Sequence, residues 1–136
     1  QDAGADLSRV VLCHMDRTHP DGEGIEPLLA RGAVVEWDFF GIEQSHYWMT
    51  DAVELPTDLG RLRHIARMID AGYGSQITLS HDICTKTRLH RWGGHSYGHI
   101  LTNVVPLMRR LGFSPQTITS LTRDNALRVL SLKETV

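Results

Sequence analysis

The chain has 136 residues, 41% of them hydrophobic, which is enough for a single folded core. Its formal net charge of −2 argues against nucleic acid or an anionic membrane as the main partner. No apolar run approaches the roughly 20 residues that span a bilayer. Two cysteines, Cys13 and Cys84, form no disulfide framework and fit a reducing, cytoplasmic compartment. Eight histidines point to metal and proton-transfer chemistry.

Short apolar segments alternate with helical ones from the start of the chain. The run 9–13 is apolar and β-branched, which predicts a buried parallel strand. Apolar residues at helical spacing over 24–31 predict a helix that ends at a glycine. A second strand is expected over 33–37, and a long loop rich in aromatic residues follows over 39–57.

The middle of the chain repeats this alternation. Asp58 can cap a helix through about Ala71, with an apolar stripe along one face. Glycines end that helix, and 76–80 is expected to form the third strand. A second long loop is expected over 82–96.

The last third of the chain is predicted to be helical. A helix over 97–111 should be kinked by Pro106, because proline removes a backbone donor. Ser114 precedes a proline, which is typical of a cap followed by the first helical residue. Asp124 or Asn125 is expected to cap a final short helix.

This order of elements predicts an α/β fold with a parallel sheet. Three parallel strands with two faces to cover make a poor free-standing domain. They fit better as part of an eight-stranded barrel, which typically needs roughly 250 residues. A flavodoxin-like, doubly wound sheet is the alternative, but it would also need more strands. We therefore expect residues 1–136 to form a single partial domain.

Two of the predicted strands end in histidine and aspartate. His14 follows the first strand, and Asp82 follows the third. In α/β barrels the carboxyl ends of the strands carry catalysis, and these side chains are ordinary ligands for zinc-like cations. The alternative is that both residues only form hydrogen bonds to a neighbouring loop.

The second strand ends in two carboxylates of the same parity. Glu36 and Asp38 should point to one face of the sheet, where a buried carboxylate needs a partner or a metal. A structural salt bridge with an arginine or lysine of a neighbouring strand is the alternative interpretation.

The loop 85–95 concentrates cations, histidines and a tryptophan. These groups could hold an anionic substrate over a metal site, or they could form a solvated basic loop. In the first case, aromatic side chains should line the acyl end of the substrate, and we expect these to be Phe39, Phe40 and Trp92.

Four segments, in order and at barrel spacing, resemble the phosphotriesterase family. They match the sixth, seventh and eighth strands and the glycine-rich run before the last barrel helix. The similarity is greatest to the phosphotriesterase-related protein branch and extends from about residue 8 to 132. The segments are Val11–Thr18, Glu36–Gly41, Ile77–Asp82 and Gly93–Leu101.

The resemblance implies a C-terminal fragment of a TIM (β/α)₈ barrel, with strands six to eight and their helices. It also implies two divalent metal ions, most often Zn²⁺, and a metal-activated water that attacks an ester, lactone, amide or phosphoester bond of a small molecule. On this pattern His14 is a metal ligand, and Asp82 is both a metal ligand and the catalytic proton acceptor. The expected substrate-binding residues are Arg17, Asp38, Phe39, Arg88 and Trp92.

Two departures from the family pattern bear on activity. Phe39 stands where aryl phosphotriesterases have a histidine, and Arg17 stands where the phosphotriesterase has a second acid. Both changes disfavour phosphotriester turnover. The ligands expected on strands one, four and five have no counterpart here, so the chain alone should be inactive. A non-catalytic binding barrel is the alternative function, and the full-length protein could be a homodimer.

Overall fold

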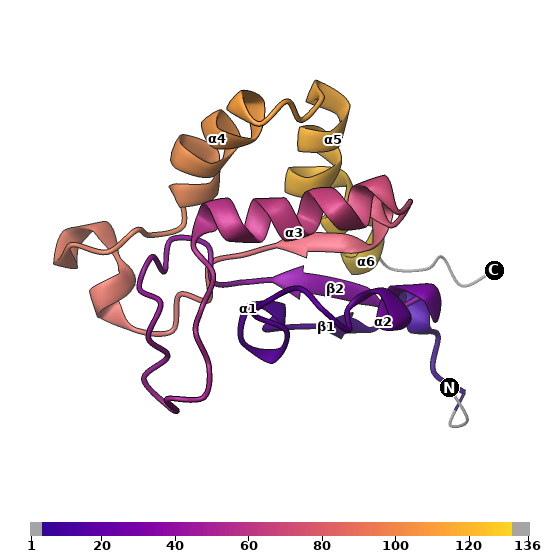
Figure 1. Ribbon diagram of the computed structural model, residues 1–136. Helices are drawn as coiled ribbons and strands as arrows, with labels where there is room; N and C mark the ends of the chain where they lie inside the picture. The colour runs from indigo at the N-terminus through magenta and orange to yellow at the C-terminus, as the bar shows by residue number, and fades with distance from the viewer. Residues whose placement is uncertain (1–3, 132–136) are drawn as a thin grey trace.

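A computed structural model describes residues 4–131 and shows a three-stranded parallel sheet with helices packed on it (Figure 1). The strand order is β1-β2-β3, with β1 at Val11–Leu12, β2 at Val34–Trp37 and β3 at Ile77–Leu79. Within these residues the predicted α/β class and all three strands are confirmed. The ends of the expected 1–136 unit, residues 1–3 and 132–136, lie outside the described residues.

The predicted helices are found in the expected order, and α1 is a further short helix that the sequence did not predict. Helix α3 packs along the sheet, α4 and α5 lie beyond α3, and α6 lies beside β3 (Figure 1). Short 3₁₀ turns occur at 7–9, 74–76, 86–88 and 90–92. The α-helices are α1 (Met15–Thr18), α2 (Glu26–Ala30), α3 (Asp58–Asp70), α4 (Val105–Arg110), α5 (Pro115–Thr119) and α6 (Asn125–Leu130).

The two faces of the sheet differ in chemistry. Val35, Trp37 and Ile77 pack into the main apolar core with Leu62 and Ile65 of α3. Because side chains alternate along a strand, residues of the other parity face away from this core. That opposite face carries the polar side chains of Glu36, Asp38 and Thr78. The sequence predicted that the two carboxylates, Glu36 and Asp38, share one face.

Helix α3 begins one residue earlier than the sequence indicated. Thr57 is the cap, and its hydroxyl accepts a hydrogen bond from the Gly60 N–H at 3.2 Å. Asp58, which we expected to be the cap, is instead buried at 7% exposure and binds Arg61. The expected cap was wrong because threonine and aspartate are both good caps, and the Asp58 carboxylate is instead bound by Arg61, His99 and the Gly41 N–H.

The late helices are also less segmented than predicted. The helical backbone from His99 onward contains a π-helical stretch, Ile100–Val104, before α4 begins. The irregularity therefore precedes Pro106, which lies in the first turn of α4. Asp124 caps nothing, because a second π-helical stretch, Ser120–Asp124, joins α5 to α6. The Ser114 cap is confirmed, with its hydroxyl 3.0 Å from the Thr117 nitrogen.

The two ends of the sheet carry different structures. The long loops gather at the carboxyl ends of the strands, and the first turn of the chain and α6 meet at the opposite end (Figure 1). There, Arg9 donates a hydrogen bond to the Ser131 carbonyl at 2.6 Å. No helix within residues 4–131 is long and apolar enough to cross a membrane.

Candidate active site

His14 and Asp82 lie at the same end of the sheet, the one formed by the carboxyl ends of the strands. β1 and β3 both run parallel to β2, so their carboxyl ends coincide. Both residues have left-handed backbone conformations, with φ of 61° at His14 and 43° at Asp82. Such conformations are costly for residues other than glycine and concentrate at functional sites. The metal-binding roles of the two residues remain predictions.

His14 is held by the carboxylate that ends β2. Its Nδ1 lies 2.7 Å from Asp38 Oδ2, and its backbone N–H donates to the same oxygen at 3.1 Å. The Asp38 N–H in turn donates to Asp16 Oδ2 at 2.9 Å. These contacts fix the imidazole with its Nδ1 toward a carboxylate, the arrangement typical of a histidine that binds metal through its other nitrogen.

Burial shapes the protonation of this acidic face. It raises the pKa of Asp38 to about 6, although the neighbouring His14 opposes the shift. Burial, followed by the Glu36 carboxylate, raises the pKa of the Cys13 thiol to about 11. Both shifts favour the neutral form of each group relative to its ordinary pKa, but Asp38 is still mostly ionised at pH 7.

A buried ion network supports the ends of β1 and β2 from the helix side. Arg61 of α3 is fully buried and binds Asp16, Asp58 at 2.8 Å and the Ile42 carbonyl at 3.1 Å. His99 Nε2 lies 2.6 Å from the second oxygen of Asp58. Burial alone would raise the pKa of Asp58, but the Gly41 N–H, His99 and Arg61 outweigh it and hold that pKa below its usual range.

Arg88 holds Asp82 from the basic loop. Its Nη1 donates to the Asp82 backbone carbonyl and, at 3.0 Å, to Asp82 Oδ2. The guanidinium also lies over the Trp48 ring, 5.5 Å from the ring centroid. Arg88 is therefore fixed between the strand end and the tip of the other long loop.

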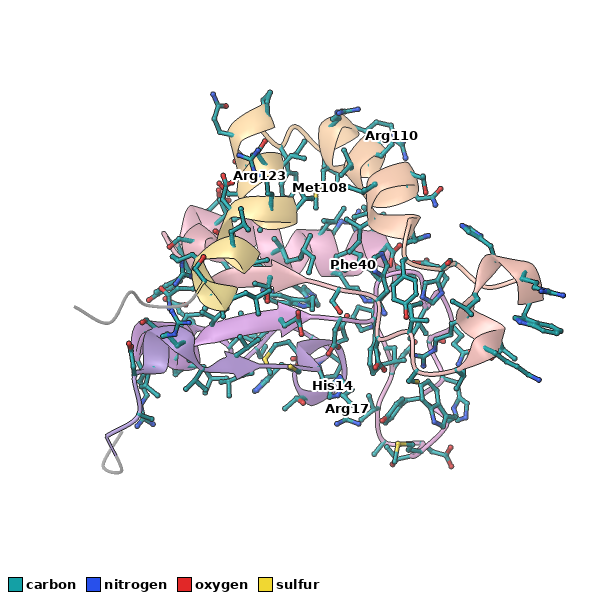
Figure 2. The ribbon with its side chains drawn as sticks, turned by 180° about the vertical axis from the view of Figure 1, so that it is seen from behind. His14, Arg17, Phe40, Met108, Arg110 and Arg123 are labelled. Atoms are coloured by element: carbon teal, nitrogen blue, oxygen red, sulfur yellow. The ribbon has the colours of Figure 1, made fainter. Side chains whose placement is uncertain are left out.

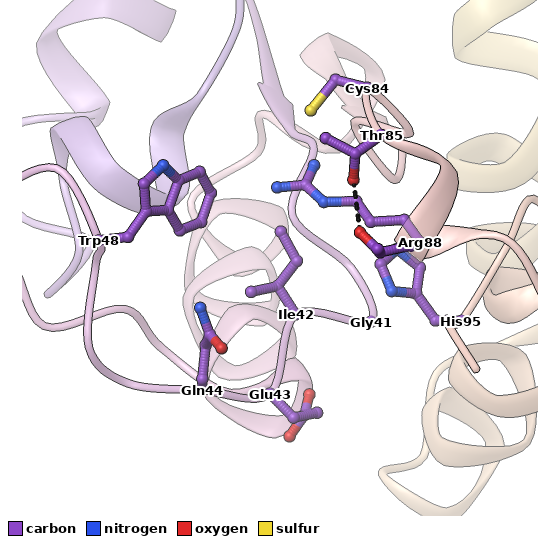
Figure 3. Close-up of a pocket in the computed structure, with 11 residues that line it drawn as sticks. Gly41, Ile42, Glu43, Gln44, Trp48, Cys84, Thr85, Arg88 and His95 are labelled. Carbon is purple, nitrogen blue, oxygen red and sulfur yellow. Dashed lines mark hydrogen bonds between the residues drawn. The ribbon is translucent and has the colours of Figure 1, made fainter. Parts of the chain in front are cut away.

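A pocket of about 510 Å³ opens between the two long loops. Figure 3 shows the Arg88 guanidinium pointing across this pocket toward Ile42 and Trp48. The lining combines the Arg88 cation with the Glu43 carboxylate, an imidazole, hydroxyl groups, a thiol and an indole, so an anionic end of a small ligand would have to meet Arg88. The lining residues are Gly41, Ile42, Glu43, Gln44, Trp48, Cys84, Thr85, Thr87, Arg88, Gly94 and His95.

Two glycines allow these loops to approach closely. A Cβ on Gly94 would overlap the backbone of Arg88, and a Cβ on Gly41 would overlap the His95 ring. The Arg88 carbonyl accepts the Ser96 N–H at 2.7 Å, which closes the basic loop on itself. Glycine at positions 41 and 94 therefore permits the close packing of the two long loops.

Three histidines pack beside Asp82. The rings of His81, His95 and His99 have centroids 5.7 to 6.5 Å apart. His81 Nε2 accepts the Ile100 N–H at 3.0 Å, which joins β3 to the start of the late helices. Burial, followed by the two neighbouring imidazoles, lowers the pKa of His81 to about 4. His81 is therefore neutral at physiological pH.

The other predicted substrate-binding residues are not equally close to the pocket. Arg17 projects from α1 near His14 (Figure 2) and donates to the Tyr47 hydroxyl at 2.7 Å. Phe39 packs 5.5 Å from the His14 ring in a small apolar cluster of the first long loop. Trp92 is 53% exposed, lies between Lys86 and Arg91, and does not line the pocket. The substrate roles of these three residues stay predictions.

The expectation that Phe40 lines the acyl end was wrong. Its side chain is fully buried in the core on the helix side of the sheet, beneath the Arg61 guanidinium (Figure 2). The two neighbouring side chains belong to different clusters, Phe40 to the main core and Phe39 to the small cluster of the first long loop. Phe39 lies beside the His14 ring and is itself only 2% exposed.

Several residues of the site did not stand out in the sequence. Tyr47 and Trp48 reach Arg17 and Arg88 from a loop without periodicity, and Asp16 meets Arg61 across 45 positions. The only local signal was the aromatic content of the loop 39–57.

Comparisons with known proteins show the family of the chain. The family model described as the phosphotriesterase family matches residues 1–130. An N-acetyltaurine hydrolase of Dictyostelium discoideum is 42% identical over 97% of this chain and 36% of its own length. A resiniferatoxin-binding protein from Rhodobacter sphaeroides superimposes with a TM-score of 0.85 at 35% identity, over 94% of this chain and 35% of that one.

A second solved structure comes from Escherichia coli. This phosphotriesterase homology protein, complexed with phosphate in its active site, has a TM-score of 0.81 and 27% identity. The match covers 96% of this chain and 41% of that protein. The chain therefore belongs to the phosphotriesterase family, as its motifs indicated. It spans somewhat more than a third of the length of the curated relatives that it matches.

Proposed function

We propose that this chain is the C-terminal portion of a metal-dependent hydrolase and supplies strands six to eight of a (β/α)₈ barrel. The observation that carries the proposal is that two strands, β1 and β3, are followed by potential metal ligands at the same, carboxyl-terminal end of the sheet. His14 directs Nδ1 at Asp38, and Asp82 lies two strands away, both with left-handed backbones. Imidazole nitrogen and carboxylate oxygen suit Zn²⁺ and related divalent ions.

The residues present fit part of a two-metal centre. Asp38 buries the Nδ1 side of His14, and no hydrogen bond of its Nε2 is formed within residues 4–131, so Nε2 is the expected ligand atom. Asp82 would supply a carboxylate oxygen. When bound, the ions would lower the pKa of a water molecule and polarise the substrate carbonyl. A catalytic zinc ion usually takes about three protein ligands, so the remaining strands of the complete protein must contribute the rest.

The chain's own residues have separable roles in this mechanism. Asp82 accepts the proton of the attacking water, and Arg88 keeps its carboxylate oriented through two hydrogen bonds. All the Arg88 hydrogen bonds formed within the described residues use Nη1, so its other nitrogens can face the pocket. The two free thiols support a reducing, cytoplasmic location.

We infer a small N-acylated anion as the substrate class. The cation at the pocket supports this choice, and so do relatives named N-acetyltaurine hydrolase that are 37–42% identical. The anionic end would meet Arg88, while Phe39 would border the acyl end beside His14. Bulky neutral phosphotriesters should be poor substrates.

The test uses the complete protein with N-acetyltaurine and a neutral N-acyl analogue. Arg88→Ala should raise KM for the anion by roughly tenfold or more, the loss of a charged hydrogen bond, and change KM for the neutral analogue much less. Arg91→Ala is the matched control, because Arg91 stacks on Trp92 outside the pocket. Equal effects of Arg88→Ala on both substrates would contradict this assignment.

A non-catalytic binding protein is the second candidate. The observation that favours it is the structural match to a protein described as binding resiniferatoxin. On this alternative the complete protein would bind a small molecule in the loop pocket without turnover. Hydrolysis of the N-acyl anion by the complete protein would exclude it.

A further inference from the structure

Two aromatic side chains at the tip of the first long loop contact arginines from two other segments. The Arg88 guanidinium lies over the Trp48 ring, 5.5 Å from its centroid. The neighbouring Tyr47 hydroxyl accepts a hydrogen bond from Arg17 at 2.7 Å. We propose that Trp48 is a positioning residue, which holds the Arg88 guanidinium for the anionic end of the substrate and so sets the preference for anions. This inference rests on the proposed function, because it concerns the same pocket.

The backbone of the loop fixes where its tip lies. At the base of the loop, the Leu55 N–H donates a hydrogen bond to the Ser45 carbonyl at 2.6 Å. At the tip, the Thr50 N–H donates to the Tyr47 carbonyl at 3.1 Å, which closes a turn. The loop therefore closes on itself, and Trp48 lies within its terminal turn.

An apolar cluster anchors this tip to the rest of the chain. Tyr47 packs there with Phe39 and Leu55, and Tyr47 and Phe39 are only 4% and 2% exposed. The Trp48 ring stacks with Phe39 at 6.5 Å and contacts Tyr47 at 4.9 Å between centroids. All of these neighbours belong to this chain, so the placement of the indole does not depend on the strands that a complete barrel would add.

The indole affects the arginine in two ways. A cation over an aromatic ring is attracted by the quadrupole of that ring. Contact with the ring also restricts the long arginine side chain, so less conformational entropy is lost when a ligand binds. Arg88 Nη1 donates to Asp82 at 3.0 Å, and the indole covers the guanidinium, so the remaining N–H groups keep a fixed direction. Such a planar set of donors matches the paired oxygens of a carboxylate or sulfonate.

A second tryptophan provides an internal comparison. Trp92 lies beside Lys86 and Arg91, and neither of these cations lines the pocket. Trp48 lines the pocket and contacts Arg88, the cation of the basic loop that also lines it. Both indoles therefore contact cations of one loop, but only the loss of Trp48 should change anion binding.

The kinetic test uses the complete protein with the N-acyl anion and its neutral analogue. Trp48→Leu should raise KM for the anion roughly threefold to tenfold, the size of one cation–π contact, and leave kcat and the KM of the neutral analogue unchanged. Trp48→Phe keeps an aromatic face and should restore most of the affinity. Trp92→Leu is the matched control and should change neither KM. In Arg88→Ala, adding Trp48→Leu should have no further effect, because the indole acts through that guanidinium.

A second measurement does not depend on turnover. Modification of Arg88 by phenylglyoxal, followed by mass spectrometry of the digested protein, should be about threefold faster or more in Trp48→Leu, because the contact with the ring is lost. The rate should stay unchanged in Trp92→Leu. If the wild type does not hydrolyse the N-acyl anion, the proposed function fails, and the modification rates still decide whether Trp48 holds Arg88. Equal modification rates in Trp48→Leu and the wild type, an unchanged KM for the anion, or equal rises in KM for both substrates would overturn the inference.

Discussion

The ion network around Arg61 and the basic loop around Arg88 each pair an arginine with an aspartate, but they differ in burial. Arg61 and Asp16 are both fully buried, and the guanidinium also binds Asp58 and the Ile42 carbonyl. The Arg88 and Asp82 side chains are 13% and 28% exposed, and they lie beside an open pocket. The first pair holds the strand ends in place, whereas the second can exchange partners when a ligand binds.

The largest effect should come from breaking the buried pair. Arg61→Met leaves two carboxylates buried without their cation, and we expect a loss of about 3–5 kcal/mol in the free energy of unfolding. Arg67→Met is the control, because its ion pair with Glu23 is exposed and should contribute about 0–1 kcal/mol. Urea denaturation of the three proteins measures the difference. Similar midpoints for both variants would remove the distinction between the two regions.

Breaking the pair at the mouth should cost less. Arg88→Met removes a charged hydrogen bond that remains accessible to water, so we expect a loss of about 1–2 kcal/mol. Asp82 can then be hydrated, unlike Asp16. The same denaturation series tests this ranking, and a loss equal to that of Arg61→Met would show that the mouth is as rigid as the buried network.

These two pairs also mark the limit of what could be predicted from sequence. Short β-branched runs that end in polar residues predicted the strands and the α/β class. They also predicted that His14 and Asp82 lie at the same end of the sheet. The partner of Asp16 could not be predicted, because Arg61 lies on α3, 45 positions away. Thr57 replaced Asp58 as the cap because the Asp58 carboxylate also binds His99, 41 positions away, and the Gly41 N–H.

The basic loop shows the same limit. Its cations predicted an anion-binding mouth, but Lys86 and Arg91 stack on Trp92 while only Arg88 lines the pocket. Which cation turns inward depends on how the glycine at 94 lets the loop fold against Arg88, a tertiary contact. Trp48, from the other long loop, completes the pocket without any motif of its own.

His81 links the two regions and should give a pH effect of moderate size. Its pKa is about 4 in the folded chain and about 6.5 when unfolded, so the unfolded state binds more protons between these values. His81 therefore contributes stability that is present above about pH 6.5 and is lost as the pH falls toward 4. NMR titration should find the His81 imidazole still neutral at pH 5, and an ordinary pKa would contradict its burial beside His95 and His99.

Asp38 should act in the opposite direction over part of this range. Its folded pKa of about 6 lies above its usual value, so it contributes stability that is present at low pH and lost as the pH rises through 6. The two effects nearly cancel between about pH 4 and 6, so His81→Gln should unmask the Asp38 effect. The free energy of unfolding of this variant, measured by urea denaturation, should then fall as the pH rises over this range.

The smallest stability effect should come from the outer cations of the loop. Lys86→Ala and Arg91→Ala remove contacts with a tryptophan that is half exposed, so each should change the free energy of unfolding by less than about 0.5 kcal/mol. A larger loss measured by denaturation would mean that the outer loop, like the Arg61 network, helps to hold the fold.

The central claim is that Asp82 takes part in hydrolysis, and Asp82→Asn in the complete protein tests it most directly. The change keeps the shape of the side chain but removes its charge and its capacity to accept a proton. We predict a fall in kcat for the N-acyl anion on the order of 10²–10⁴-fold, with the folded state retained by circular dichroism. Asp70→Asn, at an exposed position of α3, should leave kcat unchanged. Normal turnover by Asp82→Asn would contradict the account.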